Sequence, residues 1–278
     1  MTQHAAENSL NPRFLAGPLA TLGFVTRAFL FVVYLLFGLL LALAIGAFWV
    51  QNKPWQKPAI HAYCVGLCRL LRLRIRVTGA PPPGAALVVG NHISWLDIPV
   101  LFATLAGSRF LAKSEVRQWP LVGALGVAAG TLFMRRDGHP TRAINHQIRQ
   151  QLQQGFPVVV FPEGTTSDGA GVLPFHGKLF GAPLSTGLPV QPVLLRYRSQ
   201  GRRSRVAPFI GDEGFYSHLA RILAGEPLTV EVHWLPALPV PCVEDSMAEE
   251  SEPWKARKTE LAERARQQIT EALQQADD

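Results

Sequence analysis

A histidine and an aspartate stand five residues apart in residues 91–97, Asn-His-Ile-Ser-Trp-Leu-Asp, which follow an apolar run and Gly90. An imidazole is a suitable general base near neutral pH, and a carboxylate on its other ring nitrogen would orient it and stabilise the imidazolium. Five residues of regular helix rotate by about 500°, so the two side chains cannot share one helix face. They can meet if His92 lies in a loop ahead of a helix with Ser94 as its N-cap.

The same spacing also has a purely structural interpretation. Ser94 and Asp97 have the separation of a capping box, so Asp97 could simply cap the helix. A histidine with a carboxylate could also belong to a metal site, but no third ligand is suitably spaced in the sequence. These residues alone therefore leave catalysis and helix capping open.

Two further stretches carry groups that could bind a polar ligand. Residues 161–167, Phe-Pro-Glu-Gly-Thr-Thr-Ser, end an apolar run, and Gly164 after Glu163 permits close backbone approach. Such a loop could hold a headgroup or be an ordinary turn. Residues 130–136, Gly-Thr-Leu-Phe-Met-Arg-Arg, end in two arginines, which suit bidentate phosphate binding or a solvated strand end.

The elements that must position these residues alternate in type. Period-two and short apolar runs predict strands over 72–78, 85–90, 110–113, 131–135, 157–161, 191–197 and 228–234. Helical spacing predicts helices over 94–105, 141–154 and 252–276. Strands interleaved with helices predict an α/β domain.

An uncharged apolar run covers 28–50 and is 23 residues long, enough to span roughly 30 Å of hydrocarbon. It is too long for the core of a signal peptide. A buried core helix is the other alternative, and Gly38 and Gly46 leave a shallow re-entrant insertion open. Basic residues gather after the run, so the positive-inside rule predicts a cytoplasmic catalytic part. These residues are Lys53, Lys57, Arg69, Arg72, Arg74 and Arg76.

The composition of the 278 residues agrees with a membrane-associated protein. Charged residues make up 17% and hydrophobic residues 48%, which excludes a disordered chain. The net charge is +7, although residues 244–278 hold ten acids against five bases. No zinc-finger, RNP or basic-zipper pattern supports nucleic acid as the partner, so anionic lipid is favoured. Three cysteines exclude a disulfide-rich scaffold, and we expect Cys64 and Cys68 to be reduced and buried.

Together these stretches resemble the glycerolipid acyltransferase family, which comprises the 1-acylglycerol-3-phosphate acyltransferases and their lysophospholipid and lyso-ornithine lipid relatives. The residues that match its four motifs are, in order, Asn91, His92 and Asp97; Gly130, Phe133, Met134 and Arg136; residues 161–167; and Leu188, Pro189, Pro192 and Val193. The resemblance covers about residues 70–200. It implies an α/β fold with a mixed sheet flanked by helices, preceded by an N-terminal membrane helix.

We expect a chain divided into an N-terminal segment (1–27), a membrane anchor helix (28–50), an acyltransferase domain (51–243) and an acidic C-terminal helix packed on that domain (244–278). The resemblance implies that His92 deprotonates a lysolipid hydroxyl, that Asp97 orients His92, and that no acyl-enzyme forms. It implies substrate-binding roles for Lys113, Arg136, Glu163, Gly164 and Thr165.

The resemblance further implies acyl-CoA or acyl-carrier protein as the donor, no metal or organic cofactor, and an inner-membrane location. Lysophosphatidate is the first expected acceptor and lyso-ornithine lipid the second. Thr166 stands where many phosphatidate-forming members have arginine, and His176 and Lys178 replace a lysine and a glycine. Rival hypotheses are a thioester hydrolase and a non-catalytic lipid-binding protein. The absence of a Gly-x-Ser-x-Gly elbow weakens a serine-hydrolase interpretation.

Overall fold

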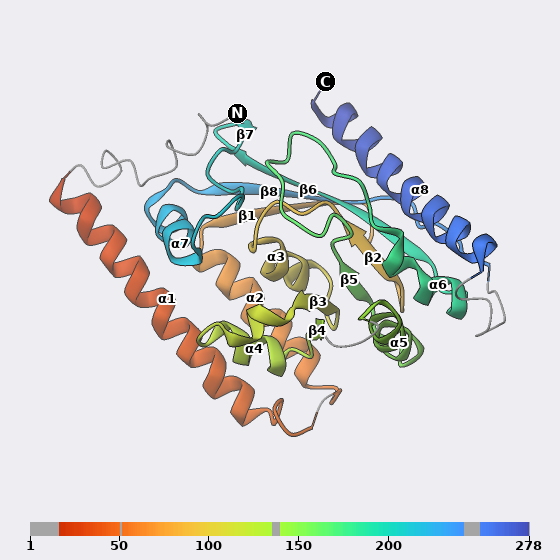
Figure 1. Ribbon diagram of the computed structural model, residues 1–278. Coiled ribbons are helices and arrows are strands. Elements are labelled where there is room, and N and C mark those ends of the chain that lie inside the picture. Colours follow the sequence, from red (N-terminus) through yellow and green to blue (C-terminus); the bar gives the residue numbers. More distant parts are fainter. Residues whose placement is uncertain (1–16, 51, 135–139, 242–250, 278) are drawn as a thin grey trace.

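An eight-stranded sheet forms the centre of the computed structural model, which describes residues 17–50, 52–134, 140–241 and 251–277 (Figure 1). The strands are β1 (Leu73–Thr78), β2 (Leu87–Gly90), β3 (Arg109–Lys113), β4 (Leu132–Met134), β5 (Val158–Val160), β6 (Val190–Ser199), β7 (Arg202–Arg203) and β8 (Leu228–Trp234). Their order is β1-β8-β6-β2-β5-β3-β4, with β7 paired to β6. Strands β6, β2, β5, β3 and β4 run parallel, whereas β8 is antiparallel to β6 and parallel to β1. The sheet is therefore mixed, as the resemblance implies.

Helices cover both faces of this sheet. They are α1 (Pro18–Ala44), α2 (Gln56–Leu70), α3 (Asp97–Thr104), α4 (Val122–Ala128), α5 (Pro140–Gln153), α6 (Gly181–Thr186), α7 (Phe215–Ala224) and α8 (Glu252–Asp277), with 3₁₀ turns at Ser114–Gln118 and Gly177–Phe180. One core cluster joins the sheet to α1, α2, α3 and α7, and a second joins it to α5, α6 and α8. Along β2, Val88 faces the first cluster while Leu87 and Val89 face the second. Burial on both faces explains the continuous apolar run of this strand.

Helix α8 packs as its sequence predicts. Its apolar residues Trp254, Leu261, Ala265, Ile269 and Leu273 are all buried. At its far end, the guanidinium groups of Arg196 and Arg198 donate to the carbonyl of Ala276, at 2.8 and 3.1 Å. Cations at a helix C-terminus satisfy free carbonyls and the helix dipole. These contacts attach the end of α8 to the basic strand β6.

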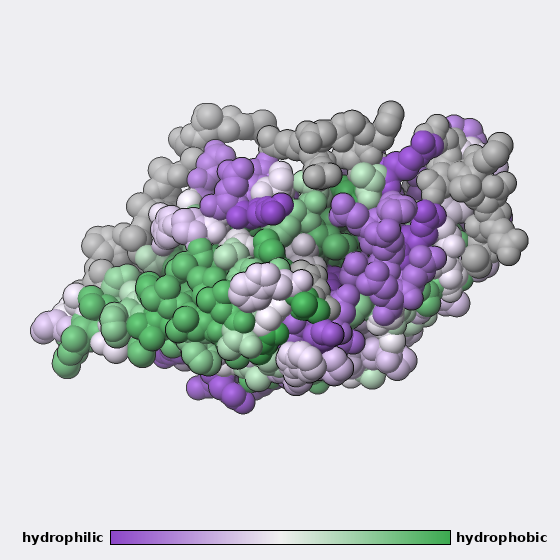
Figure 2. All heavy atoms as spheres, turned by 90° about the horizontal axis from the view of Figure 1, so that it is seen from below, coloured by the Kyte–Doolittle hydropathy of each residue, from purple (hydrophilic) through white to green (hydrophobic). Residues whose placement is uncertain are grey.

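Helix α1 lies along one side of the domain, beside α2, α4 and α7 (Figure 1). It begins before the predicted run 28–50 and ends at Ala44, because Gly46 adopts a positive φ of 68°. Only one stripe of the helix is buried: Phe31, Leu35, Gly38 and Ala42. The rest of its apolar surface is exposed and forms a hydrophobic band (Figure 2). Within the described residues, α1 alone is long and apolar enough to cross a membrane, judged by length and composition.

Two tyrosines join α1 to α2 by ring stacking and hydrogen bonds. The rings of Tyr34 and Tyr63 stack with centroids 4.9 Å apart, and each hydroxyl donates to the other residue's carbonyl. A Cβ on Gly66 would lie 2.1 Å from the Tyr34 hydroxyl oxygen, and one on Gly38 would lie 2.5 Å from the Tyr63 ring. Gly38 therefore serves a close helix–helix contact and does not interrupt α1.

Candidate active site

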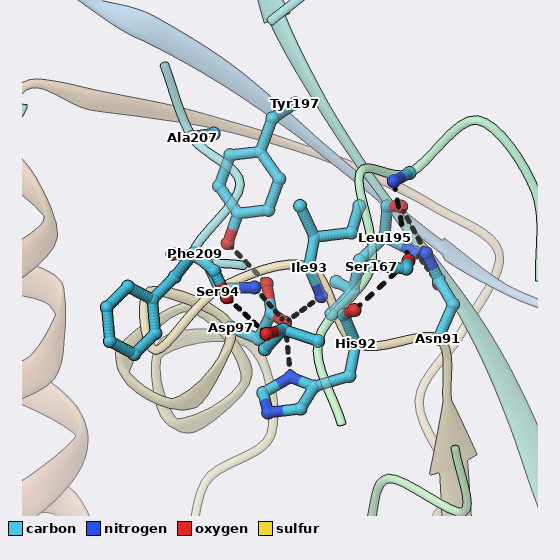
Figure 3. A network of polar contacts seen from close by, with 12 residues as sticks. Asn91, His92, Ile93, Ser94, Asp97, Ser167, Leu195, Tyr197, Ala207 and Phe209 are labelled. Atoms are coloured by element: carbon cyan, nitrogen blue, oxygen red, sulfur yellow. Dashed lines mark hydrogen bonds and ion pairs between the residues drawn. The ribbon is translucent and has the colours of Figure 1, made fainter. Parts of the chain in front are cut away.

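His92 lies in the loop that joins β2 to α3, and α3 begins at Asp97. The imidazole Nδ1 is 2.8 Å from the Asp97 Oδ2 atom. Because a carboxylate only accepts hydrogen bonds, Nδ1 carries the proton, and the lone pair is on Nε2. Figure 3 shows this second nitrogen pointing away from Asp97 and the surrounding network. The loop placement that the spacing required is present, and it gives the geometry of an oriented general base.

Asp97 also holds the start of α3. Its Oδ2 atom accepts the backbone amides of Ile93 and Ser94, at 2.8 and 3.0 Å. Asp97 therefore fixes the loop before α3 as well as the imidazole, although no side-chain hydrogen bond caps the helix. The prediction that Ser94 is the N-cap is wrong: its hydroxyl is buried without a partner among the described residues, and the helix starts three residues later. The Asp97 carboxylate accepts the amides of Ile93 and Ser94, which lie in the loop before the helix.

Three neighbours fix the loop that carries His92. The Asn91 amide exchanges two hydrogen bonds with the backbone of Leu195 on β6, at 2.9 and 2.8 Å. The Phe161 ring stacks on the imidazole with centroids 4.0 Å apart and 8° between planes. The backbone amide of Ser167 donates to the His92 carbonyl at 2.7 Å. Two of the matched motifs thus meet at one histidine (Figure 3).

Known proteins are similar to this chain in sequence and in fold. The family model described as Acyltransferase matches residues 74–196. A lyso-ornithine lipid O-acyltransferase of Pseudomonas aeruginosa is 42% identical over 210 residues, which cover 72% of this chain and 81% of that protein. The chain belongs to the acyltransferase family. A 1-acyl-sn-glycerol-3-phosphate acyltransferase of Neisseria gonorrhoeae is 36% identical over 75% of this chain and 79% of its own length.

A solved structure supports the fold of this acyltransferase. The 1-acyl-sn-glycerophosphate (LPA) acyltransferase PlsC of Thermotoga maritima aligns with a TM-score of 0.57 at 22% identity, over 90% of this chain and 95% of that one. The resemblance derived from the motifs is thereby confirmed for family and fold. The apolar helix α1 of this acyltransferase agrees with association with a membrane.

Glu163 is a buried acid in the loop after β5, near His92. The residue is 4% exposed, and no described side chain hydrogen-bonds its carboxyl oxygens. Burial raises the pKa of this carboxyl to about 8, although the backbone amides of His92 and Leu173 lower it in part and Asp97 adds to the rise. Without a ligand, Glu163 is therefore largely protonated near neutral pH. A ligand cation would instead stabilise its ionised form.

We expect the stability of the acyltransferase to fall as pH rises from about 4.5 to about 8. The folded state binds the Glu163 proton more tightly than the unfolded state, so its contribution is complete below the unfolded pKa and is lost through the folded pKa. Glu163→Gln should remove this pH dependence of the free energy of unfolding. Titration of Glu163 accounts for a loss of at most about 3 kcal/mol between low pH and pH 7. Unfolding in detergent at pH 5 and pH 7.5 measures it. Glu260→Gln, on the exposed side of α8, is the control; parallel profiles for Glu163→Gln and wild type would contradict the assignment.

The other predicted binding residues lie at different places around the acyltransferase site. Gly164 and Thr165 are exposed beside Glu163, and Gly164 has a positive φ of 70° that suits glycine. Lys113 is exposed at the carboxyl end of β3, the same sheet edge that carries His92. Arg136 lies outside the described residues. The structure thus places Lys113 and the Glu163 loop at one edge, consistent with a shared binding surface.

Tyr197 on β6 is a member of the site that sequence reasoning missed. Its hydroxyl donates to the Asp97 Oδ1 atom at 2.6 Å, and the residue is buried (Figure 3). Burial and the neighbouring Asp97 charge raise its pKa well above the usual value, so it stays a donor across the working pH range. Asp97 therefore receives hydrogen bonds on both oxygens. The sequence offered no signal, since Tyr197 lies 100 residues away within a strand.

Tyr197→Phe should lower kcat about tenfold with little change in KM. The hydroxyl does not reach the reactants, but its bond to a charged group is worth about 1.5–3 kcal/mol, part of which orients Asp97 and, through it, His92. Steady-state kinetics check this split. The matched control is Tyr216→Phe, which makes the same change on the exposed surface of α7. A rise in KM alone would contradict a positioning role.

His218 on α7 fixes a second wall of the site. It accepts from the Trp95 indole at 2.9 Å through Nδ1, so its Nε2 proton faces the carbonyls of Ala207 and Pro208, each 3.1 Å away. Burial and the nearby Arg221 lower its pKa to about 4, so it is neutral in this position. The segment it holds reaches the catalytic loop through the Phe209 amide, which donates to the Ile93 carbonyl. His218 thus supports the active site as a structural histidine.

Proposed function

We propose that this acyltransferase transfers a fatty acyl chain from an acyl thioester to the free hydroxyl of lyso-ornithine lipid. The observation that carries the choice of acceptor is Thr166, which stands in place of arginine in the loop of the buried Glu163. An ornithine headgroup carries an amine and a carboxylate but no phosphate. Its ammonium could pair with the Glu163 carboxylate, and without an arginine at position 166 the loop lacks the cation that would bind a phosphate.

The geometry supports a single-displacement reaction. The Nε2 atom of His92 takes the hydroxyl proton as the acceptor oxygen attacks the thioester carbonyl. A new carbon–oxygen ester bond forms, the carbon–sulfur bond breaks, and the proton passes from His92 to the leaving thiolate. Asp97 stabilises the imidazolium between these two steps. We propose acyl-CoA or acyl-carrier protein as the donor, without a metal or organic cofactor, because these groups supply every proton transfer the reaction needs.

Lysophosphatidate is the second candidate acceptor, and the sequence alone placed it first. Relatives of both names match this chain to a similar extent, including a 1-acyl-sn-glycerol-3-phosphate acyltransferase of Neisseria meningitidis at 37% identity over 66% of this chain. The positive charge of residues 1–243 also suits an anionic acceptor.

Labelled acyl-CoA and acyl-carrier protein should be offered to the purified protein with lyso-ornithine lipid or lysophosphatidate. We expect the label on ornithine lipid. Label on phosphatidate alone would overturn the acceptor while keeping the reaction, and release of free fatty acid without an acceptor would make the protein a hydrolase.

Thr166→Arg should shift the rate ratio towards lysophosphatidate. The Thr166 hydroxyl donates to the Phe209 carbonyl, beside the loop of Glu163. An arginine here adds a phosphate-binding cation, and a charge-assisted contact of about 1.5–3 kcal/mol corresponds to a ratio change of about tenfold or more. Competition between the two acceptors in one vessel measures it. Thr259→Arg, on the exposed surface of α8, is the control, and an equal shift in both variants would count against a specific role for position 166.

We propose that the catalytic domain faces the cytoplasm at the inner membrane. The basic residues that follow α1 and the cytoplasmic origin of acyl-CoA and acyl-carrier protein support this side. Because α1 also packs along α2, α4 and α7, we propose that its exposed hydrophobic band inserts into the membrane while the helix stays packed on the domain. Cleavage of α8 by added protease in inverted vesicles, with protection in intact cells, would support this side; the opposite pattern would refute it.

A further inference from the structure

A surface pocket lies between the α1–α2 turn, α2 and the start of β3. Its lining includes Lys53, Lys57 and Arg109 and no acidic residue. Arg109 pairs with Val158 at the amino-terminal ends of β3 and β5, whereas His92 follows the carboxyl end of β2. The pocket is therefore separate from the catalytic pair, at the opposite edge of the parallel strands.

The Arg109 guanidinium in this pocket is fixed by hydrogen bonds and by an aromatic ring. The residue is only 6% exposed, and its guanidinium donates to the Ala129 carbonyl at 2.8 Å and to the Asn52 side-chain oxygen. It also stacks on the Phe156 ring, 4.4 Å from the centroid. No ion pair with an acid is found for it among the described residues. A guanidinium has five N–H donors, so three remain for a ligand.

Two further features of the lining suit an anion. Ser108 is fully buried, and its hydroxyl has no hydrogen-bond partner in the described part of the chain. The Lys57 ammonium lies 4.6 Å from the Phe156 ring centroid, and Lys53 is exposed at the rim. A buried hydroxyl without a partner is costly unless a ligand supplies one. A phosphate oxygen would accept from Ser108 and Arg109 together.

The pocket also opens beside the apolar surface of the protein. Trp49 and Trp55 are 72% and 55% exposed on the α1–α2 turn, next to the lining residues Asn52 and Lys53. They continue the exposed apolar surface of α1 along the chain. Tryptophans on such a surface sit at headgroup depth in a bilayer. When this band is inserted, the pocket lies at the level of the lipid phosphates.

We propose that this pocket binds the headgroup phosphate of an anionic bilayer phospholipid that is not a substrate. Arg109 and Ser108 contact the phosphate, and Lys53 and Lys57 attract it and cover the rim. The bound lipid fixes the orientation of the enzyme relative to the bilayer. The end of the sheet that carries His92 then keeps a constant position relative to the membrane surface. The proposal holds whichever lysolipid is acylated.

The test is flotation of the full-length protein with vesicles of phosphatidylcholine, with or without phosphatidylglycerol. Lys53→Gln together with Lys57→Gln should weaken binding to phosphatidylglycerol vesicles about tenfold or more, and leave binding to pure phosphatidylcholine unchanged. Arg202→Gln with Arg203→Gln removes the same charge from exposed residues of β7 and should change binding less than about twofold. Ser108→Ala should weaken phosphatidylglycerol binding by a smaller factor. Acyl transfer in detergent should be unchanged in all three, which separates this site from catalysis and from misfolding.

Three results would overturn the proposal. An equal loss in the lysine and arginine pairs would mean attraction by net charge alone. An equal loss on both kinds of vesicle would mean that the lysines support insertion of the turn. Thermal stabilisation of the wild type by inorganic phosphate, with no preference for phosphatidylglycerol, would make the pocket a site for a free anion.

Discussion

Replacing His92 with alanine should abolish acyl transfer and leave the protein folded and bound to membranes. No other described side chain approaches Asp97 as a proton acceptor, so loss of the imidazole removes the base. General-base catalysis contributes about 10²–10⁴-fold, and we expect a loss of at least about 10³-fold in kcat. The fold should survive because Asp97 keeps its bonds from Ile93, Ser94 and Tyr197. Label transfer to lysolipid and vesicle flotation measure the two properties.

The matched control is His146→Ala, which makes the same change on the exposed side of α5 and should leave turnover unaltered. Full turnover in His92→Ala would refute the mechanism. Loss of membrane binding in that variant would instead show that the loop is needed for folding, and Phe161 stacking would be the first contact to examine.

Asp97→Asn should lower kcat about 10³-fold with KM nearly unchanged. Three donors converge on Oδ2, from His92, Ile93 and Ser94, so the asparagine oxygen will take that place. Its amide will then face the Tyr197 hydroxyl, which can turn to accept. Geometry is largely kept while the charge that stabilises the imidazolium is lost, and preorganised charge of this kind is worth several kcal/mol.

This rearrangement makes the pair of positions 97 and 197 strongly coupled. In Tyr197→Phe the asparagine amide would have no acceptor, so Asp97→Asn should destabilise the protein more in that background than in the wild type, by about 1–3 kcal/mol. Thermal unfolding of the four proteins closes the cycle. Asp212→Asn on the exposed surface is the control, and additive effects would show that Tyr197 does not turn to accept.

Short-range signals explain what the sequence could predict. The valines of β2 and β5 are apolar without alternation because both sheet faces are covered, and the loop position of His92 followed from helix geometry. The sequence patterns do not predict helices α2, α4, α6 and α7. In α2, Gly66 leaves room for the Tyr34 side chain of α1, because a Cβ there would collide with the Tyr34 hydroxyl. The reason for a glycine inside α2 is therefore visible only once α1 is packed against it. Tyr197 and His218 act on the catalytic loop from 100 or more residues away, and their partners are set by the sheet order β6-β2 and by the docking of α7.

The contact between α1 and α2 bears on how this enzyme can be produced and on how it could evolve. Phe31 and Leu35 of α1 belong to the same core cluster as Val100 and Ile222. A shortened protein that starts after Ala44 would open this core and uncover Tyr63, so cutting off the apolar helix should yield insoluble protein and no water-soluble catalytic fragment. For the same reason the helix cannot be exchanged for an unrelated anchor. A water-soluble descendant would have to keep α1 and replace its outer apolar residues with polar ones.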